Sequence, residues 1–131
     1  DTIQQAETET KVTKSKSGGQ PVERDLSPAK MLIIMVDETD TWKGLPLYEA
    51  LMQRLVRHEV AGATALSGVM GFGIHGRIHR RGPVGSGDAP IAVLSVDTED
   101  KLRSVLPDIQ QMVREGMMFL TDVEVVPVAG N

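Results

Sequence analysis

Short apolar runs separated by polar or amphipathic stretches make up most of this chain. The first run, Met31–Val36, has six consecutive apolar residues and ends at the acidic pair Asp37 and Glu38. A run of that length with such a boundary is typical of a strand buried on both faces. Comparable runs predict three further strands over Ala63–Met70, Ile91–Val96 and Phe119–Val126.

Two stretches between these strands carry apolar residues every three or four positions, which is the period of a helix with one buried face. The two stripes are Leu47–Val56 and Leu102–Val113. Pro46 suits the first position of the first helix, and Asp97 or Thr98 suits the N-cap of the second. Pro107 lies inside the second stripe and predicts a kink or a restarted helix. Gly116 is the expected stop of this helix.

The order of these elements is βαββαβ, the split βαβ arrangement of ferredoxin-like α+β domains. It predicts a four-stranded antiparallel sheet with two helices on one face. The strands Met31–Val36 and Ile91–Val96 nevertheless carry apolar side chains toward both faces, with Ser95 as the exception. Soluble monomers rarely expose a large apolar patch, so the second face needs a cover. Since the remaining segment is polar, we expect copies of the same chain to cover it in a homo-oligomer.

Residues 1–30 differ from the rest of the chain. They contain repeated Thr, Lys, Gln and Ser, and their large apolar residues are Ile3, Val12, Val22 and Leu26. Such a segment buries too little apolar surface to offset the entropy of ordering itself. We therefore divide the chain into a flexible tail or linker over residues 1–30 and one domain over residues 31–131. The alternative for the tail is an arm that docks on a neighbouring subunit. Since the chain begins without Met, we expect a fragment or a processed product.

The composition narrows the classes of function. The net charge is −4, whereas proteins that bind nucleic acids or membrane surfaces need a broad positive potential. No apolar run has the roughly 20 residues needed to span a bilayer, and the start of the chain shows no export signal. The absence of cysteine excludes disulfides and thiolate chemistry. We expect a cytoplasmic protein that binds neither nucleic acids nor membranes.

One segment, Gly71–Arg81, concentrates the glycine, arginine and histidine residues. Its glycines Gly71, Gly73 and Gly76 match the pattern G-x-G-x-x-G. A dinucleotide-binding fingerprint needs a helix to begin at this point, and the glycine- and proline-rich residues that follow cannot start one. The dinucleotide-binding interpretation therefore fails.

A different property of the same segment indicates an anion site. If the segment is extended, alternation puts His75, Arg77, His79 and Arg81 on one face. Arginine pairs with phosphate or carboxylate, histidine adds charge as the pH falls, and glycine lets backbone amides approach a ligand. The alternative is a solvated hairpin whose charges only maintain solubility. A metal site at the two histidines is disfavoured because their spacing on a strand is wide and an arginine lies between them.

The polar loop after the first strand holds the only tryptophan, Trp42, followed by Lys43. An aromatic ring beside a cation can stack on a base and contact a phosphate, so we include both residues in the candidate ligand site. The competing interpretation is that Trp42 packs on its own domain or on a neighbouring subunit.

We do not expect an enzyme. Acylphosphatases of the same fold use an arginine together with an asparagine, and the sole asparagine here is the terminal Asn131. RNA-binding sheets stack bases on aromatic residues of the central strands, and Met31–Val36 and Ile91–Val96 contain none. No Ser-His-Asp or Cys-His set is visible. We therefore predict no catalytic residue, no metal and no cofactor.

The stretch Gly44–His79 resembles the small bacterial and archaeal family known only as domain of unknown function 190. The resemblance covers about Met31–Val126, and Ala61–Gly73 is its most specific part. The residues that carry it are Pro46-Leu47-Tyr48, Gly62-Ala63-Thr64, Gly68, Gly71-Phe72-Gly73, the strand Ile91–Asp97 and Glu115-Gly116.

That family is similar to PII signalling proteins and to CutA-type proteins. The resemblance implies a subunit packed as a homotrimer around its sheets, with a long effector loop between the second and third strands, here Gly71–Asp88. PII proteins bind adenine nucleotides in clefts between subunits. We therefore expect a PII-like signalling module that binds a small anionic ligand, with an adenine nucleotide as a candidate, and regulates an unknown partner protein. The alternatives are a trimeric interaction module without a small ligand and a CutA-type ion-binding protein.

Overall fold

The computed structural model of this protein describes residues 25–72, 78–80 and 89–129. In chain order its elements are β1 (Ser27–Asp37), β2 (Thr41–Trp42), β3 (Leu45–Pro46), α1 (Leu47–Arg57), β4 (Ala63–Ser67), β5 (Met70–Phe72), β6 (Ile78–Arg80), β7 (Pro90–Asp97), α2 (Glu99–Met112) and β8 (Met117–Val125). One compact unit spans Ala29–Val123, and a second comprises Asp1–Pro28 with Glu124–Asn131. Only the outer ends of β1 and β8 fall in the second unit. Within the described part of the chain, neither helix has the length and apolar character needed to cross a membrane.

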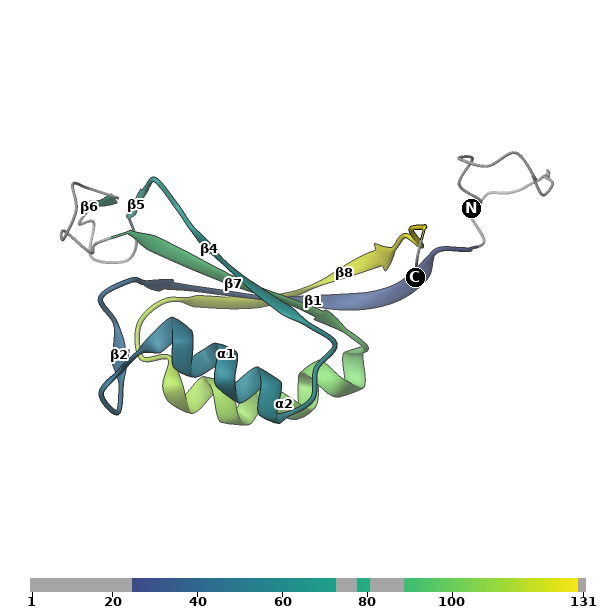
Figure 1. Cartoon of the computed structure of the whole chain (residues 1–131), viewed down its shortest axis with the longest axis horizontal. Coiled ribbons are helices and arrows are strands. Elements are labelled where there is room, and N and C mark those ends of the chain that lie inside the picture. Colours follow the sequence, from purple (N-terminus) through teal and green to yellow (C-terminus); the bar gives the residue numbers. More distant parts are fainter. Residues whose placement is uncertain (1–24, 73–77, 81–88, 130–131) are drawn as a thin grey trace. The chain divides into compact units, whose positions relative to one another are not determined.

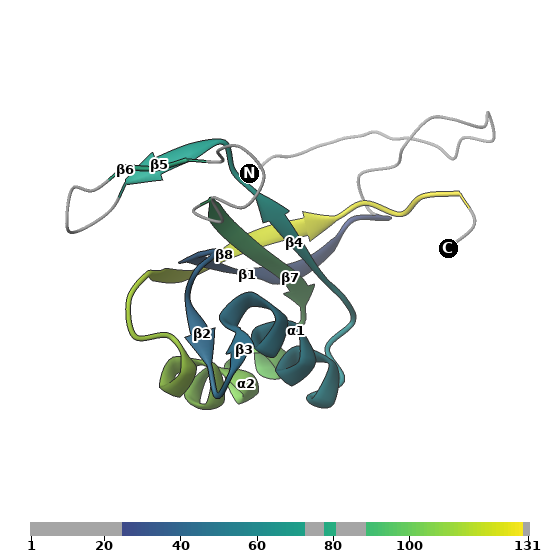
Figure 2. The same ribbon diagram turned by 60° about the vertical axis from the view of Figure 1, so that its left-hand side comes forward.

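Four strands form one sheet in the order β4, β7, β1, β8. β7 pairs antiparallel with both β1 and β4, and its Leu94 lies opposite Ile33 on one side and Thr64 on the other. The helices α1 and α2 lie together on one side of this sheet (Figure 1). The same arrangement is visible after a turn of the molecule (Figure 2). The predicted ferredoxin-like α+β fold is therefore confirmed.

The hydrophobic core lies between the sheet and the helices, because alternate residues of β1 and β7 point toward the helices. The buried strand residues are Leu32, Ile34, Val36, Ile91, Val93 and Ser95, and the buried helix residues are Leu47, Ala50, Leu51, Leu55, Leu102, Val105, Ile109 and Met112. The one polar member of this set is satisfied, since the Ser95 hydroxyl donates a hydrogen bond to the Gly62 carbonyl at 2.6 Å.

The other side of the sheet, which we call the open face, is also apolar. It carries the alternate residues Met31, Ile33, Met35, Leu66, Ala92, Leu94, Val96, Met117 and Phe119. Within one chain, Met35 and Phe119 are each 41% exposed, Leu66 is 51% exposed and Met117 is 59% exposed. No helix lies on this face in the described part of the chain. The apolar second face that the sequence predicts is therefore present.

The second predicted strand is shorter than expected. β4 ends at Ser67, and the Gly68 N–H donates a hydrogen bond to the Pro90 carbonyl at 2.6 Å. A Cβ atom on Gly68 would lie 2.8 Å from Pro90 Cγ, so a larger residue would have to push the proline away. β5 begins at Met70 and pairs with β6 instead of the main sheet. The chain thus leaves the sheet at Gly68, ahead of the predicted end at Met70.

The second helix also differs from the prediction in two respects. α2 continues as one helix through Pro107 and ends at Met112, so neither a restart at Pro107 nor a stop at Gly116 is correct. Gly116 instead has φ 142° and lies against β1, where a Cβ atom would come within 2.3 Å of the Met35 carbonyl oxygen. A glycine at position 116 therefore permits the two backbones to approach closely. The predicted N-cap is confirmed at Thr98, whose Oγ1 accepts a hydrogen bond from the Lys101 N–H at 3.2 Å.

Candidate functional site

A two-stranded hairpin, β2 and β3, replaces the polar loop expected between the first strand and the first helix. Thr41 pairs with Pro46 and Trp42 with Leu45, which leaves Lys43 and Gly44 as the turn. Their φ angles are 50° and 84°. Two consecutive left-handed residues are typical of the two-residue turn that matches the twist of a hairpin. Gly44 is the sequence signal for this turn, although a lysine before it is unusual.

A local network holds the hairpin beside the end of β1. The Asp40 N–H donates to the Asp37 carbonyl at 3.0 Å, and the Asp37 N–H donates to Asp40 Oδ2 at the same distance. The Asp40 carbonyl accepts a hydrogen bond from the Leu47 N–H at 2.7 Å, which links the loop to the start of α1. Asp40 thus fixes both ends of the loop that carries Trp42.

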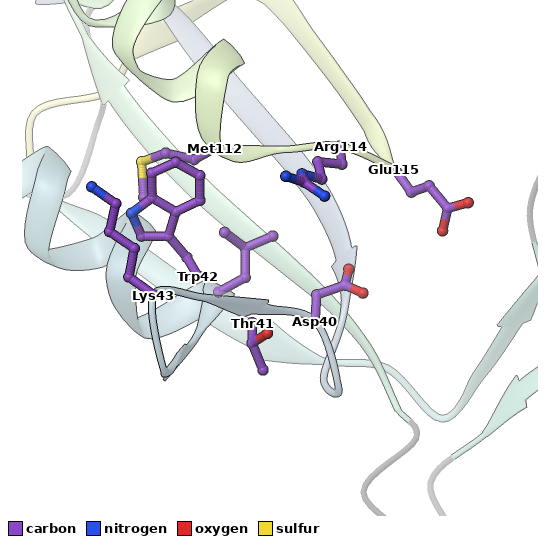
Figure 3. Close-up of a pocket in the computed structure, with 8 residues that line it drawn as sticks. Asp40, Thr41, Trp42, Lys43, Met112, Arg114 and Glu115 are labelled. Atoms are coloured by element: carbon purple, nitrogen blue, oxygen red, sulfur yellow. The ribbon is translucent and has the colours of Figure 1, made fainter.

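A surface hollow lies between this hairpin and the turn that joins α2 to β8 (Figure 3). It is lined by Asp40, Thr41, Trp42, Lys43, Leu47, Met112, Arg114 and Glu115. The Lys43 ammonium lies 5.3 Å from the centre of the Trp42 ring. In Figure 3 the Arg114 guanidinium points toward the Trp42 side of the hollow, whereas the Glu115 carboxylate points away from it.

The lining combines an aromatic wall with positive charge. Trp42 is half-buried and packs against the core, while Lys43 and Arg114 are exposed. The interpretation that Trp42 packs on its own domain is confirmed, and the residue also lines the hollow. Its contact with a ligand stays a prediction. A flat aromatic surface beside an ammonium and a guanidinium suits a planar ligand that bears an anionic group. The Asp40 carboxylate adds a hydrogen-bond acceptor to the same hollow.

The hollow lies at the end of the sheet where three connections meet. Asp37, the last residue of β1, is paired with Pro90, the first residue of β7. Gly116, just before β8, approaches Met35 near that same end of β1. The hairpin, the connection from β4 to β7 and the turn before β8 therefore share one edge of the domain. The connection over residues 68–89 contains the predicted anion-binding segment.

Most of that predicted segment lies outside the described residues, namely Gly73, His75, Gly76, Arg77 and Arg81. Gly71 belongs to β5 and His79 to β6, where the two residues are paired across the hairpin. The extended backbone predicted for the segment is thus present at Ile78–Arg80. The anion site itself stays a prediction for these residues.

Sequence reasoning missed three residues at this end of the sheet. Arg114 and Asp40 line the hollow, and Glu38 joins the hairpin loop to Ala89, the residue before β7. No local pattern marked them, because their importance depends on which connections meet. The only sequence signal was the neighbouring Glu115-Gly116 pair within the family resemblance.

A separate charged cluster joins the two helices away from the hollow. Asp108 on α2 bonds to Arg54 on α1, and its Oδ2 lies 2.9 Å from Nε2 of His58. The hydrogen bond with His58 and the Arg54 charge together lower the pKa of the Asp108 carboxyl. His58 is the C-cap of α1. We assign this cluster to helix packing.

Comparison with known proteins identifies the family to which this domain is similar. The model of the DUF190 family, described as uncharacterized ACR, matches residues 29–125. A UPF0166 protein of Methanocaldococcus jannaschii is 31% identical over 102 residues, covering 74% of this chain and 91% of the relative. A UPF0166 protein of Aquifex aeolicus is 30% identical over 99 residues, covering 74% and 92% respectively.

Solved structures of PII-like proteins share the fold. CPII, a nitrogen regulatory PII-like protein from Thiomonas intermedia K12 whose structure contains ADP, AMP and bicarbonate, superposes with a TM-score of 0.62 at 24% identity. The match covers 76% of this chain and 90% of CPII. A putative PII-like signaling protein from Thermus thermophilus has a TM-score of 0.54 at 18% identity, covering 77% and 91%.

Proposed function

This chain belongs to the DUF190 family, and from that premise we propose that it is a PII-like regulatory module that binds a small anionic ligand and thereby regulates a partner protein. An adenine nucleotide is the first candidate for the ligand. The observation that carries the proposal is the hollow, where Trp42, Lys43 and Arg114 lie together. CPII, which has a similar fold, contains ADP, AMP and bicarbonate in its structure.

The chemistry of the hollow fits such a ligand. An adenine ring would stack on the Trp42 face, while Lys43 and Arg114 would neutralise phosphate oxygens. Asp40 would accept a hydrogen bond from the exocyclic amine, because a carboxylate is only an acceptor. In this proposal Arg77 and Arg81 of the predicted anion-binding segment supply further positive charge when the ligand is bound.

The same proposal assigns the open face to self-association. Three copies would bury their apolar faces against one another, which removes the exposed methionine, leucine and phenylalanine side chains from water. The 68–89 connections would then stand beside the joins between subunits, where a neighbouring chain completes the ligand site. No catalytic residue is part of this proposal.

Isothermal titration calorimetry with ADP and AMP tests the ligand. We expect ADP to bind the unmodified protein, and we expect Arg114→Ala to weaken binding by about 10- to 100-fold, the usual loss for a charge-assisted hydrogen bond. Arg57→Ala is the matched control, since Arg57 is an exposed arginine in the last turn of α1 and does not line the hollow. The double variant Arg77→Ala and Arg81→Ala tests the predicted anion-binding segment and should abolish nucleotide binding.

The proposal is wrong if the unmodified protein shows neither heat of binding nor a raised melting temperature with ADP or AMP. If Arg114→Ala and Arg57→Ala lose ADP affinity to the same extent, the ligand does not bind in the hollow. A partner captured through the 68–89 connection regardless of added nucleotide would support the interaction module without a small ligand.

A further inference from the structure

The last rung of the β1–β7 ladder is closed by a side chain. Asp37 and Pro90 are the final pair of the ladder, and the same register brings Glu38 opposite Ala89. The Glu38 N–H donates to the Ala89 carbonyl at 2.8 Å. The return bond runs from the Ala89 N–H to Glu38 Oε1 at 3.3 Å. In a regular antiparallel pair the backbone carbonyl of Glu38 would accept that bond.

The carboxylate of Glu38 replaces its backbone carbonyl as the acceptor because the chain turns sharply after β1. The Asp40 N–H bonds back to the Asp37 carbonyl, so the backbone leaves the strand direction directly after Asp37. Ala89 is only 1% exposed, and a buried N–H needs an acceptor. The Glu38 carboxylate supplies this acceptor while the backbone turns toward the hairpin.

Each partner in this rung belongs to a different part of the candidate site. Ala89 is the end of the 68–89 connection, and the next residue, Pro90, accepts the hydrogen bond from Gly68 at the start of that connection. Gly68, the first residue of the connection, is therefore bonded to Pro90, the residue that directly follows its last residue, Ala89. On the other side, Glu38 begins the loop that Asp40 holds in place and that presents Trp42 to the hollow.

We propose that Glu38 is a positioning residue that couples the hollow to the base of the 68–89 connection. The bond from the Glu38 N–H to the Ala89 carbonyl is a backbone bond, whereas the bond from the Ala89 N–H to the Glu38 carboxylate can open by rotation of one side chain. Movement of the hairpin therefore transmits to Ala89 through Glu38 without disturbing β1. The role of a bound ligand in this coupling rests on the proposed function, but the coupling between hairpin and Ala89 does not.

The chain has a built-in reporter on each side of the rung. Trp42 is the only tryptophan and lines the hollow, so its fluorescence and its quenching by iodide report on the hairpin alone. Exchange of the Ala89 amide, followed by NMR, reports on the carboxylate bond. The variants to compare are Glu38→Ala, which removes the acceptor, and Glu38→Gln, which keeps an acceptor oxygen. Asp100→Asn, an exposed acid on α2, serves as the control.

Without any ligand, we expect Glu38→Ala to speed Ala89 exchange by about tenfold or more, as for a locally opened hydrogen bond. The same variant should change the iodide quenching of Trp42 by about twofold. Glu38→Gln and Asp100→Asn should keep Ala89 exchange and Trp42 quenching near the values of the unmodified protein. With ADP added, Ala89 exchange should slow in the unmodified protein, and Glu38→Ala should lose this response. The far-UV circular dichroism of each variant confirms folding, and Glu38→Gln remains informative if Glu38→Ala unfolds.

Two results would overturn the coupling. One is faster Ala89 exchange in Glu38→Ala with unchanged Trp42 quenching, which would make the rung a local structural contact. The other is unchanged Ala89 exchange, which would deny the rung itself. Absence of ADP binding to the unmodified protein contradicts the proposed function instead, and the ligand-free comparison still decides the role of Glu38.

Discussion

Lys43 occupies the first central position of the β2–β3 turn at φ 50°, where asparagine, aspartate or glycine is the usual residue. A residue with a β-carbon loses about 1 kcal/mol in this left-handed conformation. The contact of its ammonium with the Trp42 ring recovers about 0.5–1 kcal/mol at an exposed position. The lysine thus gives the turn little net stability. Its position at the rim of the hollow accords with a role for its charge in binding.

Lys43→Asn should have opposite effects on stability and on binding. Asn-Gly is a favoured pair for such a turn, so the free energy of unfolding should stay the same or rise by about 0.5–1 kcal/mol in urea denaturation. The affinity for ADP should fall several-fold in calorimetry because the ammonium is lost. Lys43→Arg keeps the charge and should bind nearly as well. A Lys43→Asn protein with undiminished ADP affinity would exclude the ammonium from the site.

At the scale of elements, one carboxylate ties the two helices together. Arg54 and His58 are one helical turn apart on α1, and both reach Asp108 on α2. The pKa of Asp108 is lowered from its ordinary value of 3.8, mainly by the hydrogen bond with His58. A lowered folded-state pKa means that the ionised carboxylate stabilises the fold. That contribution is complete above pH 3.8 and is lost as the pH falls through the lower, folded-state pKa.

We therefore expect Asp108→Asn to lower the midpoint of urea unfolding at neutral pH, with only a modest loss because the side chain is 32% exposed. The difference from the unmodified protein should shrink as the pH falls below 3.8. Asp100→Asn provides the comparison, as an acid on α2 outside this cluster. A difference that stays constant down to acidic pH would show that the cluster stabilises the helices by packing instead of charge.

For the whole molecule, the open face bears on whether the domain is a single chain or an assembly in water. Its central rows follow from the sheet register, because Ile33 lies opposite Leu94 and Met35 opposite Ala92. Every second residue of β1 and β7 is committed to the core, so their apolar neighbours necessarily point to the other side. Replacing them by polar residues would leave the core intact. The core of the single domain therefore does not require their apolar character, which the proposed self-association would explain.

A charge on the open face should dissociate the proposed assembly. Phe119→Arg introduces a guanidinium at a residue that is 41% exposed in one chain and lies on the edge strand β8, so the domain itself should fold. We expect sedimentation velocity at micromolar concentration to show assembled chains for the unmodified protein and single chains for the variant. Val56→Arg is the control, because Val56 is 73% exposed on α1, on the helix side of the sheet. A single folded chain for the unmodified protein at this concentration would remove self-association from the proposal.

Much of the fold was predictable because periodicity is a local property. The apolar run Met31–Val36 and the helical stripe in Leu47–Val56 each predict an element from neighbouring residues alone. The prediction failed where local preference competes with distant contacts. The restarted helix expected as one alternative at Pro107 is absent, since α2 runs through the proline, and Gly116 resembled a helix stop although its role is to let backbones approach.

The candidate site was less predictable than the fold. Trp42 and Lys43 were selected from their residue types, and the structure places both in one hollow. Arg114 was not selected, since a single arginine after a helix carries no signal of its own. Its place beside the hairpin depends on where α2 ends, since Met112 at that end lines the same hollow.

The order of the main strands and helices, the ferredoxin-like arrangement and the apolar character of both sheet faces follow from local spacing, because each depends on near neighbours in the chain. The tertiary structure alone decided which connections meet at one end of the sheet. It also decided that a carboxylate, Glu38, completes the ladder opposite Ala89. Such contacts join residues far apart in the chain, and their geometry depends on the register of the whole sheet, which no local pattern specifies.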